Sequence, residues 1–130
     1  MPLAVVGVSH ETAPVEIRER VAYDPSEVSE VLEYLRREEG VQEAVLLSTC
    51  NRTEVYLFPA RSDNAASTVE RALSRKVAGL EGGVAKYLFL KDGEEAVRHL
   101  FSVTAGLDSL VTGESEIQGQ VRDAYQRAAE

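Results

Sequence analysis

The sequence has few of the residues that form disulfides or bind structural metal ions. Its 130 residues include one cysteine, two histidines and no tryptophan. A single cysteine excludes an internal disulfide and a cysteine-rich metal site, and two histidines make a zinc centre unexpected. No apolar run approaches the roughly 20 residues that span a membrane, and Met1 is not followed by the basic flank of a signal peptide. We therefore expect a cytoplasmic protein without a membrane partner.

Basic residues are also scarce. Lysine and arginine number 14 against 22 aspartates and glutamates, which gives a formal net charge of −8 at pH 7. Because nucleic-acid binding depends on neutralising phosphates, this balance argues against a general nucleic-acid binder, and any such partner would have to be engaged locally. The length and the 44% of hydrophobic residues suit one globular domain with its own core.

The single cysteine lies in the heptad Ser48-Thr49-Cys50-Asn51-Arg52-Thr53-Glu54, between two apolar runs at 44–47 and 55–58. These runs have strand length and branched residues, so the heptad is predicted to be a tight connection at the rim of a sheet. The planar fork of Arg52 matches a carboxylate, and a cation beside a thiol favours the thiolate. The heptad is therefore a candidate nucleophile with an anion receptor. The competing interpretation is a small cysteine that only packs.

The order of predicted elements indicates the fold class. It runs strand, helices, strand, strand, helix, strand, then helices. This is the split βαβ pattern of an α/β (α+β) ferredoxin-like sandwich, with extra helices at the carboxyl end. The predicted strands are 3–8, 44–47, 55–58 and 86–90, and the predicted helices are 15–21, 25–39, one opened by 62–64, 96–104 and 114–130.

His99 is the second candidate. Helical spacing predicts that Val97, Leu100, Phe101 and Thr104 form the main core face, with His99 beside it. A half-buried histidine satisfied by a backbone carbonyl is one interpretation. Histidine is also the usual partner of a cysteine nucleophile, and spacing alone leaves both open.

Three motifs together resemble those of the glutamyl-tRNA reductase family, in the family's order and spacing. They are Gly7-Val8-Ser9-His10 with Thr12-Ala13-Pro14, the cysteine heptad, and His99-Leu100-Phe101 continuing through 106–111 to Gly113-Glu114. The resemblance implies a catalytic domain at 1–112. It also implies that 113–130 begin a helix leading to an NADPH-binding domain and a dimerisation region outside this chain. The last motif departs from the family pattern at Glu116 and Gln118.

The resemblance implies an NADPH-dependent oxidoreductase that converts glutamyl-tRNA to glutamate-1-semialdehyde, the first step of tetrapyrrole (porphyrin) synthesis by the five-carbon route. Cys50 would attack the ester and hold a thioester, and His99 matches the histidine that the family needs near the thiol. Arg52 matches the residue that pairs with the glutamate side chain. The rest of the family's glutamate pocket corresponds to Thr49, Asn51, Ser109, Glu114, Ser115, Glu116 and Gln120.

The family's partners are implied in the same way: glutamyl-tRNA, a second copy in a full-length homodimer, and glutamate-1-semialdehyde aminomutase. Two other classes of protein remain open from the residues alone. One is a non-catalytic ferredoxin-like ligand-binding module in which Cys50 only packs. The other is a cysteine acyl-transferase or hydrolase without a redox step.

Overall fold

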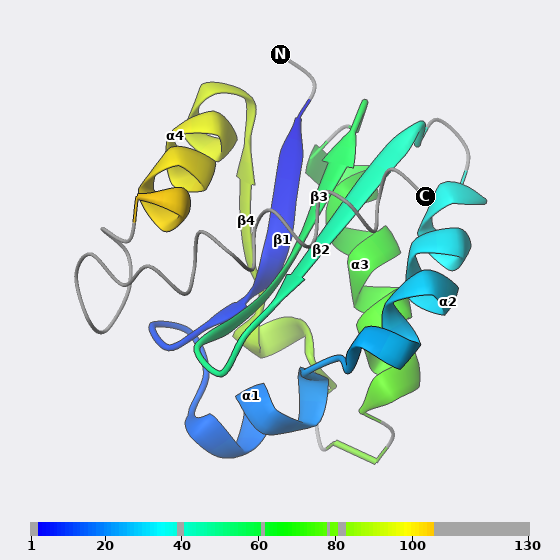
Figure 1. Cartoon of the computed structure of the whole chain (residues 1–130), viewed down its shortest axis with the longest axis vertical. Helices are drawn as coiled ribbons and strands as arrows, with labels where there is room; N and C mark the ends of the chain where they lie inside the picture. Colours follow the sequence, from blue (N-terminus) through cyan, green and yellow to red (C-terminus); the bar gives the residue numbers. More distant parts are fainter. Residues whose placement is uncertain (1–2, 39–40, 61, 78, 81–82, 106–130) are drawn as a thin grey trace.

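The computed structural model describes residues 3–38, 41–60, 62–77, 79–80 and 83–105 (Figure 1). A four-stranded sheet in the order β2-β3-β1-β4 forms its centre. The elements in chain order are β1 (Ala4–Ser9), α1 (Val15–Val21), α2 (Pro25–Arg36), β2 (Glu43–Ser48), β3 (Arg52–Phe58), α3 (Ser62–Lys76), the 3-10 turn η1 (Ala85–Tyr87), β4 (Phe89–Asp92) and α4 (Gly93–Thr104).

The connectivity confirms the predicted ferredoxin-like sandwich. The crossover through α1 and α2 carries the chain from β1 to β2, and β3 is inserted between them, antiparallel to both. In the same way α3 leads from β3 to β4, and β1 lies between those two strands. All three strand pairs are antiparallel, which is the split βαβ arrangement.

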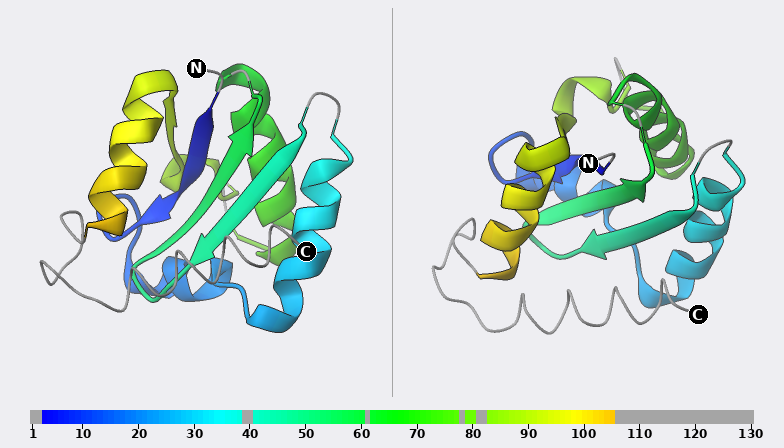
Figure 2. Two further views of the ribbon diagram at one scale, coloured as in Figure 1. Left: turned by 45° about the horizontal axis from the view of Figure 1, so that its top comes forward. Right: turned by 90° about the horizontal axis from the view of Figure 1, so that it is seen from above.

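The two faces of the sheet are covered by different helices (Figure 2). Since successive strand residues point to opposite faces, Val6 and Val55 enter the larger core, which α1, α2 and α3 cover. Val5 and Tyr56 point the other way and pack with Ala96 of α4. Full burial of a valine such as Val5, Val6 or Val55 stabilises the fold by about 1.5–3 kcal/mol. The sheet thus separates two sets of packed side chains, one on each face.

β3 is longer than the sequence predicts, because it begins at Arg52 rather than at Val55. As an inner strand it is hydrogen-bonded on both sides, with Arg52 opposite Ser9 of β1 and Thr53 opposite Ser48 of β2. This pairing draws the polar second half of the cysteine heptad into the ladder. The connection between the strands shrinks to residues 49–51.

The start of the fourth strand is also a correction. The sequence predicts a strand from Lys86, whereas η1 occupies 85–87 and β4 begins at Phe89. Pairing with β1 sets this boundary by placing Phe89 opposite Gly7. Tyr87 and Leu88, which precede the strand, pack against the larger core instead.

The predicted core face of α4 is only partly right, because Leu100 packs against the cluster of Val5, Tyr56 and Ala96 but Phe101 does not. The helix buries Ala96, His99 and Val103, whereas Phe101 is 70% exposed. Helical spacing defines two neighbouring stripes here, and docking against β1 and β4 selects the one that carries His99. The predicted helix at 114–130 lies outside the described residues.

Candidate active site

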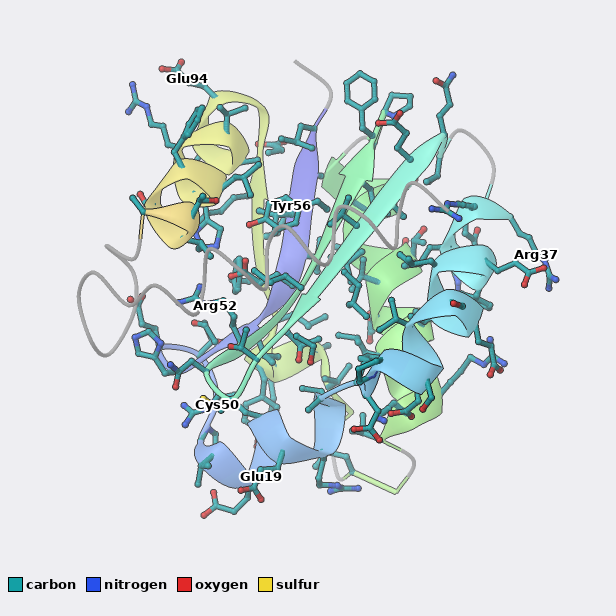
Figure 3. The ribbon with its side chains drawn as sticks, viewed as in Figure 1. Glu19, Arg37, Cys50, Arg52, Tyr56 and Glu94 are labelled. Carbon is teal, nitrogen blue, oxygen red and sulfur yellow. The ribbon has the colours of Figure 1, made fainter. Side chains whose placement is uncertain are left out.

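The cysteine stands at the tip of the β2–β3 connection. The Thr49 hydroxyl accepts hydrogen bonds from the backbone N–H groups of Asn51, at 3.1 Å, and Arg52, at 3.2 Å. The Thr49 N–H donates to the Arg52 carbonyl at 2.7 Å. Thr49 therefore closes the turn by itself. Cys50 is exposed at the end of the sheet, between Arg52 and α1 in Figure 3, which is not the place of a cysteine packed in a core.

Alternation along β3 places Arg52, Glu54 and Tyr56 on the face that α4 covers. Glu54 is fully buried and accepts three side-chain hydrogen bonds. Arg52 Nη1 donates to Oε2 at 2.8 Å, and the Tyr56 hydroxyl donates to Oε1 at 2.9 Å. His99 Nε2 lies 2.7 Å from Oε2. We call these residues, together with Lys91, the Glu54 cluster.

Lys91 determines which nitrogen of His99 carries the proton. Lys91 Nζ lies 3.3 Å from His99 Nδ1. An ammonium group has donors and no acceptor, so Nδ1 accepts this bond and the proton sits on Nε2, which donates to Glu54. The ring of Phe89 lies 5.2 Å from the ring of His99, centroid to centroid, and restricts the imidazole from a third side.

The charges of the Glu54 cluster are unequal. Burial alone would raise the pKa of Glu54. The hydrogen bond from His99, and then the charge and hydrogen bond of Arg52, outweigh burial and hold the pKa below its usual range. Glu54 is therefore a carboxylate at neutral pH. Among the described residues the cluster contains two cationic side chains, Arg52 and Lys91, and one carboxylate, a balance that suits it to one further negative charge.

Gly7 allows β1 to lie close beneath this cluster. It stands opposite Glu54 in the sheet, on the same face as the Glu54 side chain. A Cβ atom at this position would lie 2.2 Å from the Thr53 carbonyl oxygen and 2.8 Å from Glu54 Cα, inside any permitted contact. A side chain there would force β1 and β3 apart.

The structure brings part of the predicted site together. Thr49, Cys50 and Asn51 form the turn, Arg52 begins β3, and His99 reaches the same strand through Glu54. The remaining predicted site residues lie outside the described part of the chain: Ser109, Glu114, Ser115, Glu116 and Gln120.

Sequence reasoning missed the central place of Glu54 and the contribution of Lys91. Arg52, Glu54 and Tyr56 alternate at period two, which is the signal of one face of a strand. This alternation would have predicted a shared face for the three residues if the predicted strand had begun at Arg52. For Lys91 the sequence carries no signal, because its partner comes from a different element.

The described residues contain no group of three or more histidine, cysteine or acidic side chains placed to hold a metal ion. No helix within the described ranges is long and apolar enough to cross a membrane.

Comparison with known proteins supplies the context for this site. The family profile described as "Glutamyl-tRNAGlu reductase, N-terminal domain" matches residues 6–130. The glutamyl-tRNA reductase of Rubrobacter xylanophilus is 48% identical over 130 residues, and that of Marinobacter nauticus is 48% identical over 134. Both alignments cover 100% of this chain and 30% of the relative.

A solved structure is similar over the same region. The glutamyl-tRNA reductase from Methanopyrus kandleri matches with a TM-score of 0.76 and 36% identity, over 98% of this chain and 28% of that one. The chain thus spans about 30% of the length of the curated relatives that it matches.

Proposed function

The chain belongs to the family of glutamyl-tRNA reductase amino-terminal domains, and from this membership we propose that Cys50 is the nucleophile that takes the glutamyl group from glutamyl-tRNA. The observation that supports this proposal is the position of the thiol. Cys50 is exposed on a turn. Arg52, two residues further along the chain, belongs to a buried cluster that is suited to an anion. The product of the whole protein would be glutamate-1-semialdehyde, for tetrapyrrole (porphyrin) synthesis.

The acyl transfer is a simple displacement. The Cys50 sulfur forms a bond to the ester carbonyl carbon as the bond from that carbon to the ribose oxygen breaks. The thiol proton ends on the released ribose hydroxyl, so no oxidant or reductant is consumed. The resulting thioester is a better hydride acceptor than the oxygen ester, and this is the chemical reason for using a thiol.

We propose that Arg52 recognises the side-chain carboxylate of the glutamyl group. The Arg52 side chain is 1% exposed and its guanidinium is oriented by Glu54, and a pre-oriented fork loses little freedom when it binds a carboxylate. A substrate carboxylate would supply the negative charge that the Glu54 cluster is suited to receive. His99 then acts as a positioning residue, because it fixes Glu54 from the α4 side. We propose that Thr49, Asn51, Ser109, Glu114, Ser115, Glu116 and Gln120 complete the pocket.

The residues of this chain do not fit the cofactor implied by the family. NADPH supplies hydride in the reduction, and its phosphates need a glycine-rich turn or a basic surface. The sequence contains no Gly-x-Gly-x-x-Gly, and its net charge is −8. We therefore propose that residues 1–112 form the acyl-transfer domain, that 113–130 lead toward a separate NADPH domain, and that the full-length protein acts in the cytoplasm as a homodimer. Glutamate-1-semialdehyde aminomutase is its proposed partner.

The test is a single-turnover reaction with glutamyl-tRNA labelled in the glutamate and without NADPH. We expect label on the protein, released rapidly by neutral hydroxylamine, as a thioester is. Cys50→Ser should carry no such label and should keep the thermal stability of the parent. Labelling that survives Cys50→Ser would place the nucleophile elsewhere. Semialdehyde formed by this chain after addition of NADPH would contradict the separate cofactor domain.

A further inference from the structure

A recess adjoins Cys50 on the face of the sheet opposite to the Glu54 cluster. Ser48 points to this face, because its Oγ lies 3.0 Å from Thr53 Oγ1 and accepts the backbone N–H of Tyr23 at 3.0 Å. Arg52 and Glu54 point to the opposite face. A pocket of about 290 Å³ opens here, which we call the α1 pocket; it is lined by Val15, Arg18, Glu19, Ala22, Tyr23, Ser48, Thr49 and Cys50. Cys50 thus stands between the Glu54 cluster on one face of the sheet and the α1 pocket on the other.

The guanidinium of Arg18 places a fixed positive charge in the α1 pocket. Its Nη1 donates to the Ala13 carbonyl at 3.2 Å, which anchors the guanidinium. Its Nε is buried and has no hydrogen-bond partner within the described part of the chain. A guanidinium presents five donors in a planar fork, so the anchored group retains donors for an anion such as a phosphate.

The other side chains that line the α1 pocket are apolar, aromatic and acidic, a combination that suits a nucleoside. Val15 is 45% exposed and contributes an apolar surface. Tyr23 contributes an aromatic ring, and burial, followed by the nearby Glu27, raises its pKa to about 12, so its hydroxyl stays neutral beside an anion. Glu19 is the acidic member of the lining, suited to accept hydrogen bonds from a sugar hydroxyl or a base amino group. At about 290 Å³ the pocket lies close to the lower end, about 300 Å³, of small-molecule sites.

The proposed reaction requires such a compartment. A glutamyl ester carries its amino acid on one side of the carbonyl carbon and the ribose of the tRNA on the other. If the side chain of the amino acid points toward Arg52, as proposed above, the leaving nucleotide has to lie on a different side of the Cys50 sulfur. The α1 pocket includes Cys50 in its lining and lies on the face of the sheet away from Arg52.

We propose that the α1 pocket binds the 3′-terminal nucleotide of glutamyl-tRNA, with Arg18 on its phosphate and Val15 and Tyr23 against its base. This inference rests on the proposed function and names the subsite of the leaving group. It also gives the acidic chain a local cation for its nucleic-acid substrate, in place of a general basic surface.

The experiment compares two acyl donors in the full-length protein without NADPH. One donor is glutamyl-tRNA, and the other is glutamate α-thiobenzyl ester, which has the same acyl group and no nucleotide. Arg18→Gln should lower the single-turnover rate of thioester formation from glutamyl-tRNA by about 10-fold or more, as expected for a lost charge-assisted contact. The rate from the thiobenzyl ester should stay within about twofold.

Arg20→Gln is the matched control, because it removes the same charge from the exposed side of the same helix. It should leave both rates unchanged, and Arg18→Lys should recover part of the rate with glutamyl-tRNA. If Arg18→Gln lowers the rate of thioester formation equally with both acyl donors, the proposal is overturned, because the substitution then acts on the thiol or on the fold. An Arg18→Gln variant that acylates from both donors at the rate of the parent would also overturn it, because the nucleotide would then not use the charge of Arg18. Failure of the parent protein to acylate with either donor would instead refute the proposed function.

Discussion

Glu54 and His99 lie 45 positions apart in the chain, yet the Nε2–H of His99 donates to Glu54 Oε2 over 2.7 Å. This bond ties α4 to the inner strand β3. The same oxygen receives Arg52 Nη1 at 2.8 Å, so one carboxylate oxygen orients both the proposed anion receptor and the histidine. The geometry of the candidate site therefore depends on how α4 docks on the sheet.

Glu54→Gln should be strongly destabilising. The substitution keeps the shape of the side chain but leaves the buried Arg52 without its counter-charge, and removal of one partner of a buried pair costs about 3–5 kcal/mol. The measurement is the free energy of unfolding in urea. Glu33→Gln is the matched control, because its pair with Arg37 is more than two-thirds exposed on both sides, with 67% and 73%. It should cost at most about 1 kcal/mol. Equal losses in the two variants would contradict a structural role for the Glu54 cluster.

The stability of the protein should fall in acid partly through Glu54. Its pKa is lowered in the folded state, so its contribution is complete above the unfolded value of about 4.3 and is lost as the pH falls through the lower folded value. Unfolding free energy measured between pH 6 and about 3 should therefore decline less steeply in Glu54→Gln than in the parent. If the unfolding free energies of the two proteins decline in parallel with pH, the pKa of Glu54 is not lowered in the folded state.

Arg52→Lys should reduce the discrimination between glutamyl and glutaminyl substrates. Lysine keeps the charge opposite Glu54 but cannot make two parallel bonds to a carboxylate, so the loss should fall on glutamyl transfer, by about 10-fold or more. Single-turnover acylation of Cys50 from each charged tRNA measures this ratio. Alkylation of Cys50 by iodoacetamide serves as the control and should change little. If the preference for glutamate is intact, recognition belongs to other residues.

Gly7→Ala should destabilise the fold by about 1–3 kcal/mol or more, because its methyl group would meet the Thr53 carbonyl oxygen at 2.2 Å and force the backbone to shift. Thermal unfolding measures the loss. The variant should also acylate more slowly from glutamyl-tRNA, since the displaced strand carries Glu54. Gly79→Ala is a useful comparison: it has no atom within 4 Å of the added carbon, and only its φ of +84° opposes the change. A Gly7→Ala protein as stable as the parent would mean that the two strands can separate at little cost.

Much of the fold follows from local signals in the sequence. The helix from Val15 to Val21 after Pro14, the helix from Pro25 and the order of the strands were all predictable, since periodicity, proline and capping residues act within a few positions. The turn that carries Cys50 was predictable for the same reason. Family resemblance then identified Cys50, Arg52 and His99 as candidates, because their motifs keep a fixed order along the chain.

Only the tertiary structure decided how these candidates meet. Strand pairing on both sides of β3 drew Arg52 and Glu54 into the sheet and onto one face. Docking of α4 then chose the stripe with His99 over the stripe with Phe101. Both outcomes depend on residues distant in sequence. The period-two pattern of Arg52, Glu54 and Tyr56 is compatible with one strand face but does not fix where the strand begins, and helical spacing fits both stripes of α4. The sequence by itself determined which side chains are available, and the long-range packing of β3 and α4 decided that a single buried carboxylate holds them together.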